Sequence, residues 1–217
     1  MDVSGRVACV TGASSGLGRR AALVLSHAGA SVVAVARRAE ALASLEAEAL
    51  GALYPLPFDL SDRDRLEDLA AQVAEPFGAP DILVHAAGIN TREVADAVTP
   101  EGWDVTLQLN LTVPFFLSQH LVPAMKAKGW GRIVTFASLQ STRAFPAGLS
   151  YGASKGGVAQ ITRAMAEAWS KDGINTNAIG PGFFRTELTE AVFADPDRAA
   201  RNAAQTCIGR NGELEDI

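Results

Sequence analysis

The sequence predicts a single α/β domain in which helices flank a doubly wound, parallel β-sheet. Short runs rich in β-branched residues alternate with longer segments whose apolar residues recur every three or four positions. Strands separated by helices cannot pair as hairpins, so they pair in parallel through right-handed crossovers. The chain has 217 residues, of which 48% are hydrophobic, which is enough for one core of ordinary size. We therefore expect residues 1–217 to form one domain.

The first half of the chain predicts three strand–helix units. Residues 6–11 (RVACVT) and 31–36 (SVVAVA) are valine-rich strands, and 53–58 is a weaker third strand. Residues 16–29 have helical periodicity. Two further helices place apolar residues at the same spacing, namely Leu42, Leu45 and Ala49, then Leu66, Leu69 and Val73. Ser61 is the expected N-cap of the last of these helices, because its hydroxyl can accept from a free N–H of the first turn.

The second half continues the alternation. Residues 81–85 (DILVH), 132–137 (RIVTFA) and 173–179 (GINTNAI) are short and rich in β-branched residues, which predicts three more strands. Residues 99–128 and 150–171 are predicted to be helical. The second of these helices carries one apolar side, formed by Val158, Ile161, Met165 and Trp169.

The composition argues against several kinds of partner. A net charge of -5 gives no general attraction to phosphate backbones, so we expect no nucleic-acid partner. The two cysteines, Cys9 and Cys207, and the three histidines are too scattered to suggest a disulfide framework or a metal site, and Cys9 is expected in the core. The chain shows neither a secretion signal nor a long apolar span, so we expect a cytoplasmic protein without a membrane partner.

A glycine-rich turn follows the first predicted strand and opens the first predicted helix. Gly12, Gly16 and Gly18 let the chain turn sharply and let its backbone approach a pyrophosphate closely. The helix N-terminus then offers free N–H groups and a positive dipole to the phosphates. In the first turn of a strand–helix–strand unit this pattern predicts a Rossmann-type dinucleotide site, although a purely structural turn is the alternative.

The end of the second predicted strand indicates which dinucleotide binds. An acidic residue is expected there if a ribose 2′-hydroxyl is bound, but the chain has Ala36 followed by Arg37 and Arg38. Arg37 can pair with a 2′-phosphate, which favours NADP(H) while leaving NAD(H) possible. The alternative is that both arginines are solvated residues at a helix start. Asp59 lies either near the adenine edge or in an ordinary loop.

Tyr151 and Lys155 are four residues apart and therefore lie on one face of a predicted helix. Tyrosine has an unperturbed pKa of about 10, which is too high for a base at neutral pH. A nearby ammonium group lowers the pKa of a phenol, so the pair can act as an acid/base. Ser138 follows the predicted strand at 132–137, at the strand end where such sheets bind ligands, and its hydroxyl can hold a substrate oxygen.

Asn110 and Pro114 form a further candidate feature. In a regular helix the Asn110 carbonyl would accept from the N–H of Pro114, which proline lacks. The freed carbonyl can hold a water that links Lys155 to solvent. A packing kink with no chemical role is the alternative.

These residues together resemble the short-chain dehydrogenase/reductase family. The matching motifs cover nearly all of the chain in the family's order: TGASSGLG at 11–18, AAG at 86–88, Asn110, Ser138, YGASK at 151–155, and Pro181, Gly182 and Thr186. The resemblance implies hydride transfer, with one domain carrying the cofactor and substrate sites. It implies that Asn110, Ser138, Tyr151 and Lys155 are catalytic. Implied cofactor contacts are Gly12, Ser14, Ser15, Gly16, Leu17, Gly18, Arg37, Asp59, Leu60, Ala87, Gly88, Tyr151, Lys155, Pro181, Gly182 and Thr186.

The chain departs from the family pattern at two places. His85 stands where the family commonly has asparagine, and we interpret it as structural or near the adenine. The sequence stops at Ile217, whereas family members commonly continue through a helix and a seventh strand, so we expect that C-terminal strand to be missing.

The stretches at 88–92, 138–141 and 182–189 are similar to the gluconate 5-dehydrogenase branch of the family, which oxidises sugar acids. In such an enzyme Arg92 or Arg143 could meet a carboxylate, although either can be a solvated surface residue. A 3-oxoacyl carrier-protein reductase is the alternative, and a non-catalytic dinucleotide-sensing module is a third reading. The resemblance also implies a homo-oligomer, either a tetramer through the helices at 99–128 and 150–171 or a dimer.

Overall fold

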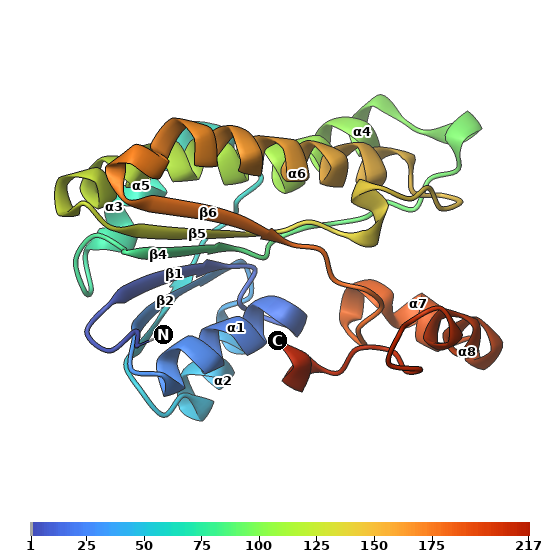
Figure 1. The fold of residues 1–217 in the computed structure, drawn as a ribbon, viewed down its shortest axis with the longest axis horizontal. Coiled ribbons are helices and arrows are strands. Elements are labelled where there is room, and N and C mark those ends of the chain that lie inside the picture. The colour runs from blue at the N-terminus through green and yellow to red at the C-terminus, as the bar shows by residue number, and fades with distance from the viewer. Residues whose placement is uncertain (1) are drawn as a thin grey trace.

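The computed structural model describes residues 2–217, and its centre is a sheet of six parallel strands (Figure 1). The strands lie in the order β3-β2-β1-β4-β5-β6, so the sheet grows outward in both directions from β1. Their bounds are β1 (Val7–Thr11), β2 (Ser31–Ala36), β3 (Leu53–Pro57), β4 (Ile82–His85), β5 (Gly131–Phe136) and β6 (Ile174–Ile179). This arrangement confirms the predicted doubly wound sheet, and each of the six strands lies within two residues of its predicted ends.

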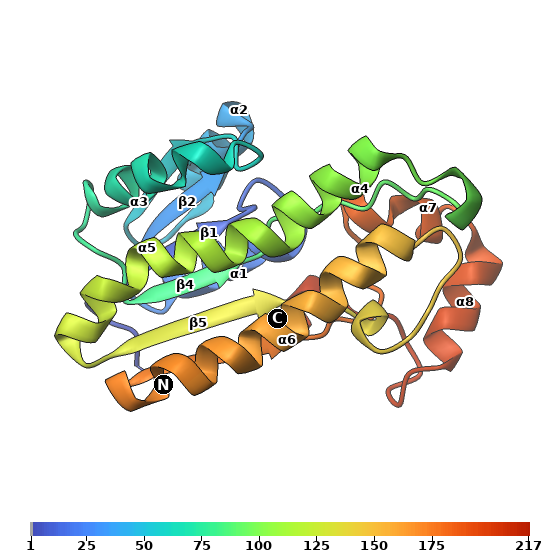
Figure 2. The ribbon, with the colours of Figure 1, turned by 90° about the horizontal axis from the view of Figure 1, so that it is seen from above.

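Helices cover both faces of the sheet. The helices α1 (Gly16–His27) and α2 (Ala39–Glu48) lie on one face, and α3 (Leu66–Ala74), α5 (Val113–Lys128) and α6 (Leu149–Trp169) lie on the other (Figures 1 and 2). The strands separate two buried clusters because successive side chains point to opposite faces. In β1, Cys9 packs in the cluster under α3 and α5, whereas Ala8 and Val10 pack in the cluster under α1 and α2.

The predicted helix at 99–128 is interrupted. It begins with α4 (Pro100–Leu107), passes through a π-helical turn at Gln108–Thr112, and continues as α5. Within the π-helical turn the N–H of Val113 donates to the carbonyl of Gln108, five residues back. Pro114 lies just beyond and has no N–H for the α-helical bond to Asn110. The proline therefore explains why regular α-helix does not run through this point.

The expected N-cap at Ser61 is wrong. The helix α3 begins at Leu66, after a short 3₁₀ turn at Arg63–Arg65. Both the N–H and the hydroxyl of Ser61 donate to Oδ1 of Asp59, at 2.9 and 2.8 Å. The local turn formed with Asp59 therefore uses the serine, and the helix starts further along the chain.

The chain after β6 adds elements that the sequence pattern did not predict. Short helices α7 (Glu190–Phe193) and α8 (Pro196–Ala204) lie beyond the end of the sheet to which the strands point (Figure 1). A 3₁₀ turn at Leu214–Asp216 then returns to α1, where Ile217 packs against the cluster under α1 and α2. Within residues 2–217 no helix is both long enough and apolar enough to cross a bilayer.

Candidate active site

A cleft of about 680 Å³ opens at the carboxyl ends of the strands. Segments that follow all six strands line it, which is where an open parallel sheet places its ligands. Every catalytic and cofactor-binding residue that the resemblance implies lines this cleft except Asn110. The sheet therefore brings together residues that are as far apart in the sequence as Gly12 and Thr186.

The glycine-rich turn forms a cradle that side chains would fill. Gly12 has a φ of +69°, and a Cβ there would lie 2.6 Å from the backbone nitrogen of Ala87. A Cβ on Gly18 would meet the carbonyl of Gly12. Ser15 caps α1 without a side-chain bond to the helix, and the first turn of α1 contains no acidic residue. The N-terminus of this helix therefore has free N–H groups and a positive potential that fit a diphosphate.

The end of β2 carries cations and no carboxylate. Ala36 is buried, whereas Arg37 and Arg38 are exposed and line the cleft. Asp59 lines the same region, and hydrogen bonds from the Ser61 N–H and hydroxyl, together with the Arg37 charge, lower its pKa. This group of residues fits a phosphorylated ribose better than an unmodified one, because the two residues after Ala36 are cations and neither is the acid that would bind a 2′-hydroxyl.

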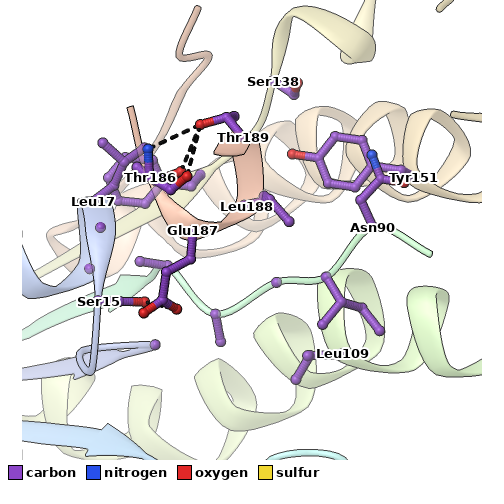
Figure 3. Close-up of a pocket in the computed structure, with 18 of the residues that line it drawn as sticks. Ser15, Leu17, Asn90, Leu109, Ser138, Tyr151, Thr186, Glu187, Leu188 and Thr189 are labelled. Carbon is purple, nitrogen blue, oxygen red and sulfur yellow. Dashed lines mark hydrogen bonds between the residues drawn. The ribbon is translucent and has the colours of Figure 1, made fainter. Parts of the chain in front are cut away.

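Tyr151 and Lys155 lie on the first turns of α6, beside the loop that follows β5. Figure 3 shows the phenol oxygen of Tyr151 inside the pocket, on the side where Ser138 lies. Ser138 begins the 3₁₀ turn at Leu139–Ser141, and its hydroxyl accepts from the N–H of Gln140 at 3.1 Å. The Ser141 hydroxyl donates to the Lys155 carbonyl at 2.7 Å, which ties this turn to α6.

The electrostatics of the pair differ from the sequence-based expectation. Burial raises the pKa of Tyr151, while the Ser138 hydroxyl and the Arg92 charge act in the opposite direction. The Lys155 ammonium lies 5.6 Å from the centre of the Tyr151 ring and donates to the Phe136 carbonyl at 2.6 Å. Burial in turn lowers the pKa of Lys155 to about 8. The positive charge of Arg92 favours the ionised form of Tyr151 and so acts to lower its pKa.

Asn110 stands behind the cleft wall. It is buried, its Oδ1 accepts from the N–H of Ile89 at 2.9 Å, and its Nδ2 donates to the Ile89 carbonyl at 2.9 Å. Nδ2 also lies 3.0 Å from the hydroxyl of Ser154 on α6. The side chain therefore fixes the loop that follows β4 against the helix that carries Tyr151.

His85 lies in the core and does not line the cleft. Its Nε2 is 2.9 Å from the Ser118 hydroxyl of α5, and burial lowers its pKa to about 3. The ring is therefore neutral at physiological pH and joins β4 to α5. The sequence allowed His85 to be structural or to lie near the adenine, and its position in the core is the structural one.

The two arginines suggested for a substrate carboxylate differ in position. Arg92 lines the cleft and has a φ of +57°, and its guanidinium donates to the Leu188 carbonyl. Arg143 is exposed, does not line the cleft, and lies 3.5 Å from the amide oxygen of Gln205. Of these two residues, only Arg92 is placed to meet a ligand in the cleft.

One contact in the cleft could not be expected from the sequence. Glu187, in the segment between β6 and α7, forms an ion pair with Arg38, which is 149 residues away in the sequence. Local patterns carry no signal for such a contact, because it depends on how the C-terminal segment folds over the sheet.

Comparison with known proteins gives one consistent result. The family model described as short chain dehydrogenase matches residues 6–197. A gluconate 5-dehydrogenase of Gluconobacter oxydans is 37% identical over all of this chain and 86% of its own length. A 3-oxoacyl-(acyl-carrier-protein) reductase of Thermotoga maritima is 34% identical over all of this chain and 89% of its own length.

A solved structure is similarly close. A protein of Beutenbergia cavernae described as a putative NAD(P) dependent gluconate 5-dehydrogenase with bound NADP has a TM-score of 0.92 and 37% identity. The match covers 99% of this chain and 87% of that one.

Proposed function

The chain belongs to the short-chain dehydrogenase family, and on that basis we propose that it interconverts a hydroxy and a keto form of a sugar acid with NADP(H). Its activity is that of an NAD(P)-dependent oxidoreductase. One observation supports the sugar-acid substrate in particular: Ser138, Tyr151 and Arg92 line the same cleft as the glycine-rich cradle. One domain thus holds both sites.

When bound in this cleft, NADP(H) would supply the hydride chemistry of the reaction. Tyr151 exchanges a proton with the substrate oxygen, and the raised pKa of its buried phenol keeps that proton available near neutral pH. The Ser138 hydroxyl donates to the same oxygen and orients it. Lys155 holds the nicotinamide ribose, and Asn110 positions the backbone at Ile89 against α6.

Several residues are proposed to hold the rest of the cofactor. The turn from Gly12 to Gly18 binds the diphosphate, and Arg37 contacts the 2′-phosphate. The NADP-bound relatives, including a gluconate 5-dehydrogenase of Burkholderia cenocepacia in complex with NADP and tartrate, support this cofactor. The remaining proposed contacts at Ser14, Ser15, Leu17, Asp59, Leu60, Ala87, Gly88, Pro181, Gly182 and Thr186 all line the cleft.

Arg92 is proposed to bind the carboxylate of the substrate. It is the cation close enough to Tyr151 to affect the tyrosine pKa, so a carboxylate bound there brings the rest of a short sugar acid to the reacting groups. A 3-oxoacyl thioester is the second candidate substrate. Phe145, Phe183 and Phe184 line the same cleft, which favours an apolar chain, and the Thermotoga relative supports it.

The experiment compares wild type with Tyr151→Phe. We expect the variant to lose turnover by about a thousandfold, because the proton donor is removed, and to keep its affinity for NADPH in a fluorescence titration. Gluconate, its 5-keto form and a 3-oxoacyl thioester are tested as substrates. Normal turnover in the variant would reject the proposed acid/base. Turnover of the thioester alone would favour the second candidate.

Self-association is also proposed. Val105 on α4, Phe116 on α5 and Leu149 on α6 are exposed apolar side chains on the helices through which a dimer or tetramer is expected. The expected cytoplasmic location stays a prediction.

A further inference from the structure

An ion pair spans the cleft between the end of β2 and the segment after β6. Nη1 and Nη2 of Arg38 each donate to one carboxylate oxygen of Glu187, both at 2.9 Å. This paired geometry is the strongest form of an arginine–carboxylate contact. The pair lowers the pKa of Glu187, so the carboxylate is charged at neutral pH.

The same carboxylate reaches the phosphate cradle. The hydroxyl of Ser15, the N-cap residue of α1, donates to Oε2 of Glu187 at 3.0 Å, and Figure 3 shows the two side chains together. Arg38 also donates to the hydroxyl of Ser14, at 3.1 Å from Nη2. Glu187 thus places a negative charge beside the free N-terminus of α1 and beside the cation at the end of β2, which are the two places where a phosphorylated dinucleotide needs to put its own charges.

The chain next to Glu187 is close to the cradle as well. A Cβ on Gly16 would lie 3.1 Å from the methyl group of Thr186. Thr186 begins the 3₁₀ turn at Glu187–Thr189, and the Thr189 hydroxyl accepts from the Thr186 N–H at 3.0 Å. The carboxylate is therefore carried by an ordered turn that rests on the glycine-rich loop.

We propose that Glu187 sets the affinity and selectivity for the cofactor by occupying Arg38 and Ser15 until a phosphorylated dinucleotide displaces it. The inference rests on the proposed function and adds a residue that opposes cofactor binding. Two anions cannot share one guanidinium fork and one hydroxyl donor without repulsion. The diphosphate displaces Glu187 from Ser15, and a 2′-phosphate releases Arg38 as well, so the competition affects NADP(H) more than NAD(H).

With competition of this kind, the apparent affinity for the cofactor is the intrinsic affinity multiplied by the fraction of protein in which Arg38 and Ser15 are free. The pair is half exposed, with 50% of the Arg38 side chain and 62% of the Glu187 side chain accessible, so the effect is moderate. We expect Glu187→Gln to bind NADPH roughly fivefold more tightly and NADH about twofold more tightly than wild type.

The test is a fluorescence titration of the full chain with NADPH and with NADH. Glu190→Gln is the matched control, because Glu190 is an exposed acid three residues further along that does not line the cleft. It should leave both affinities unchanged. Glu187→Ala, which removes the carboxylate and its contacts, should tighten NADPH binding at least as much as Glu187→Gln.

Two further readouts separate competition from a structural effect. In an Arg38→Met background, Glu187→Gln should give less gain in NADPH affinity than it gives in wild type. Without cofactor, Glu187→Gln should melt at a slightly lower temperature than wild type, because the ion pair is lost.

Unchanged or weaker NADPH binding by both Glu187 variants would overturn the inference, as would an equal gain in Glu190→Gln. In either case wild-type cofactor binding and turnover would still support the proposed function. If wild type binds neither dinucleotide, the proposed function and this inference both fail.

Discussion

The buried ammonium of Lys155 makes the stability of the protein depend on pH in a specific range. The side chain is 5% exposed, and its Nζ donates to the Phe136 carbonyl. No ion pair among residues 2–217 includes Lys155, so no carboxylate offsets the lost hydration of the charge. Burial lowers its pKa from 10.5 to about 8, so between these two values the unfolded chain binds more protons than the folded protein.

Stability rises with pH wherever the unfolded state binds more protons, so the free energy of unfolding increases as pH rises above the folded pKa. Below that value both states are charged and the burial penalty is present in full. Between about pH 8 and about pH 9.5 the expected gain is about 1.5 kcal/mol. Above about pH 10, Tyr151 acts in the opposite direction, because its folded pKa is raised and the unfolded chain loses the phenol proton first.

The assay is urea unfolding at several pH values in this range, at one protein concentration. We expect Lys155→Met to remove most of the rise, because a neutral side chain has no proton to lose. Lys171→Met, at an exposed lysine in the turn after α6, is the matched control and should keep the wild-type slope. Parallel pH profiles for wild type and Lys155→Met would refute the reasoning.

Two further predictions concern the buried His85 and the cradle residue Gly12. Because burial lowers the pKa of His85 from 6.5 to about 3, acidification from about pH 6.5 to about pH 4.5 should destabilise wild type by about 2.5 kcal/mol through this residue alone. Urea unfolding of His85→Asn should lack that loss, whereas variants of the exposed His120 should retain it. Gly12→Ala should lose about 2 kcal/mol of stability or more, because its Cβ would lie 2.6 Å from the Ala87 nitrogen. Gly182→Ala has open space and should match wild type in thermal melting.

The sheet could be predicted from the sequence because each strand is a short apolar run with its own boundaries. In β2, five of the six residues are buried, and the run SVVAVA differs clearly from the helices beside it. Parallel strands buried on both faces show this kind of continuous apolar sequence. The weaker third strand was also predicted correctly. It contains Pro55 and Pro57, which a strand tolerates at the edge of a sheet, where β3 lies.

The C-terminal elements could not be predicted in the same way. The helix α8 has no buried residue and α7 has only Val192. The apolar side of α8 consists of alanines, so the chain from 196 to 204 lacks the large apolar residues that identified the earlier helices. The same limit explains the error at Ser61, where a serine before a helical pattern suits either a cap or a local turn. Only the contact with Asp59 distinguishes the two.

The sequence predicted which residues form the site and that they lie at strand ends, but it did not predict the hydrogen bonds between them. Motif spacing placed Ser138, Tyr151 and Lys155 together, yet it gave no information on the Phe136 carbonyl that holds the lysine. It also suggested that the Asn110 backbone matters, whereas the Asn110 side chain makes the bonds that the structure shows. Such contacts depend on burial and on distant backbone, which a single sequence does not encode locally.

The π-helical turn at Gln108–Thr112 is the place where this long helix can change in length. Its hydrogen bond closes over five residues, so the turn holds about one residue more than an α-helical turn. A single deletion there that restored ordinary α-helix would leave Thr106 on α4 and Leu117 on α5 facing nearly the same neighbours. A deletion within α4 or α5 would instead rotate one half of the helix against the other by about 100°.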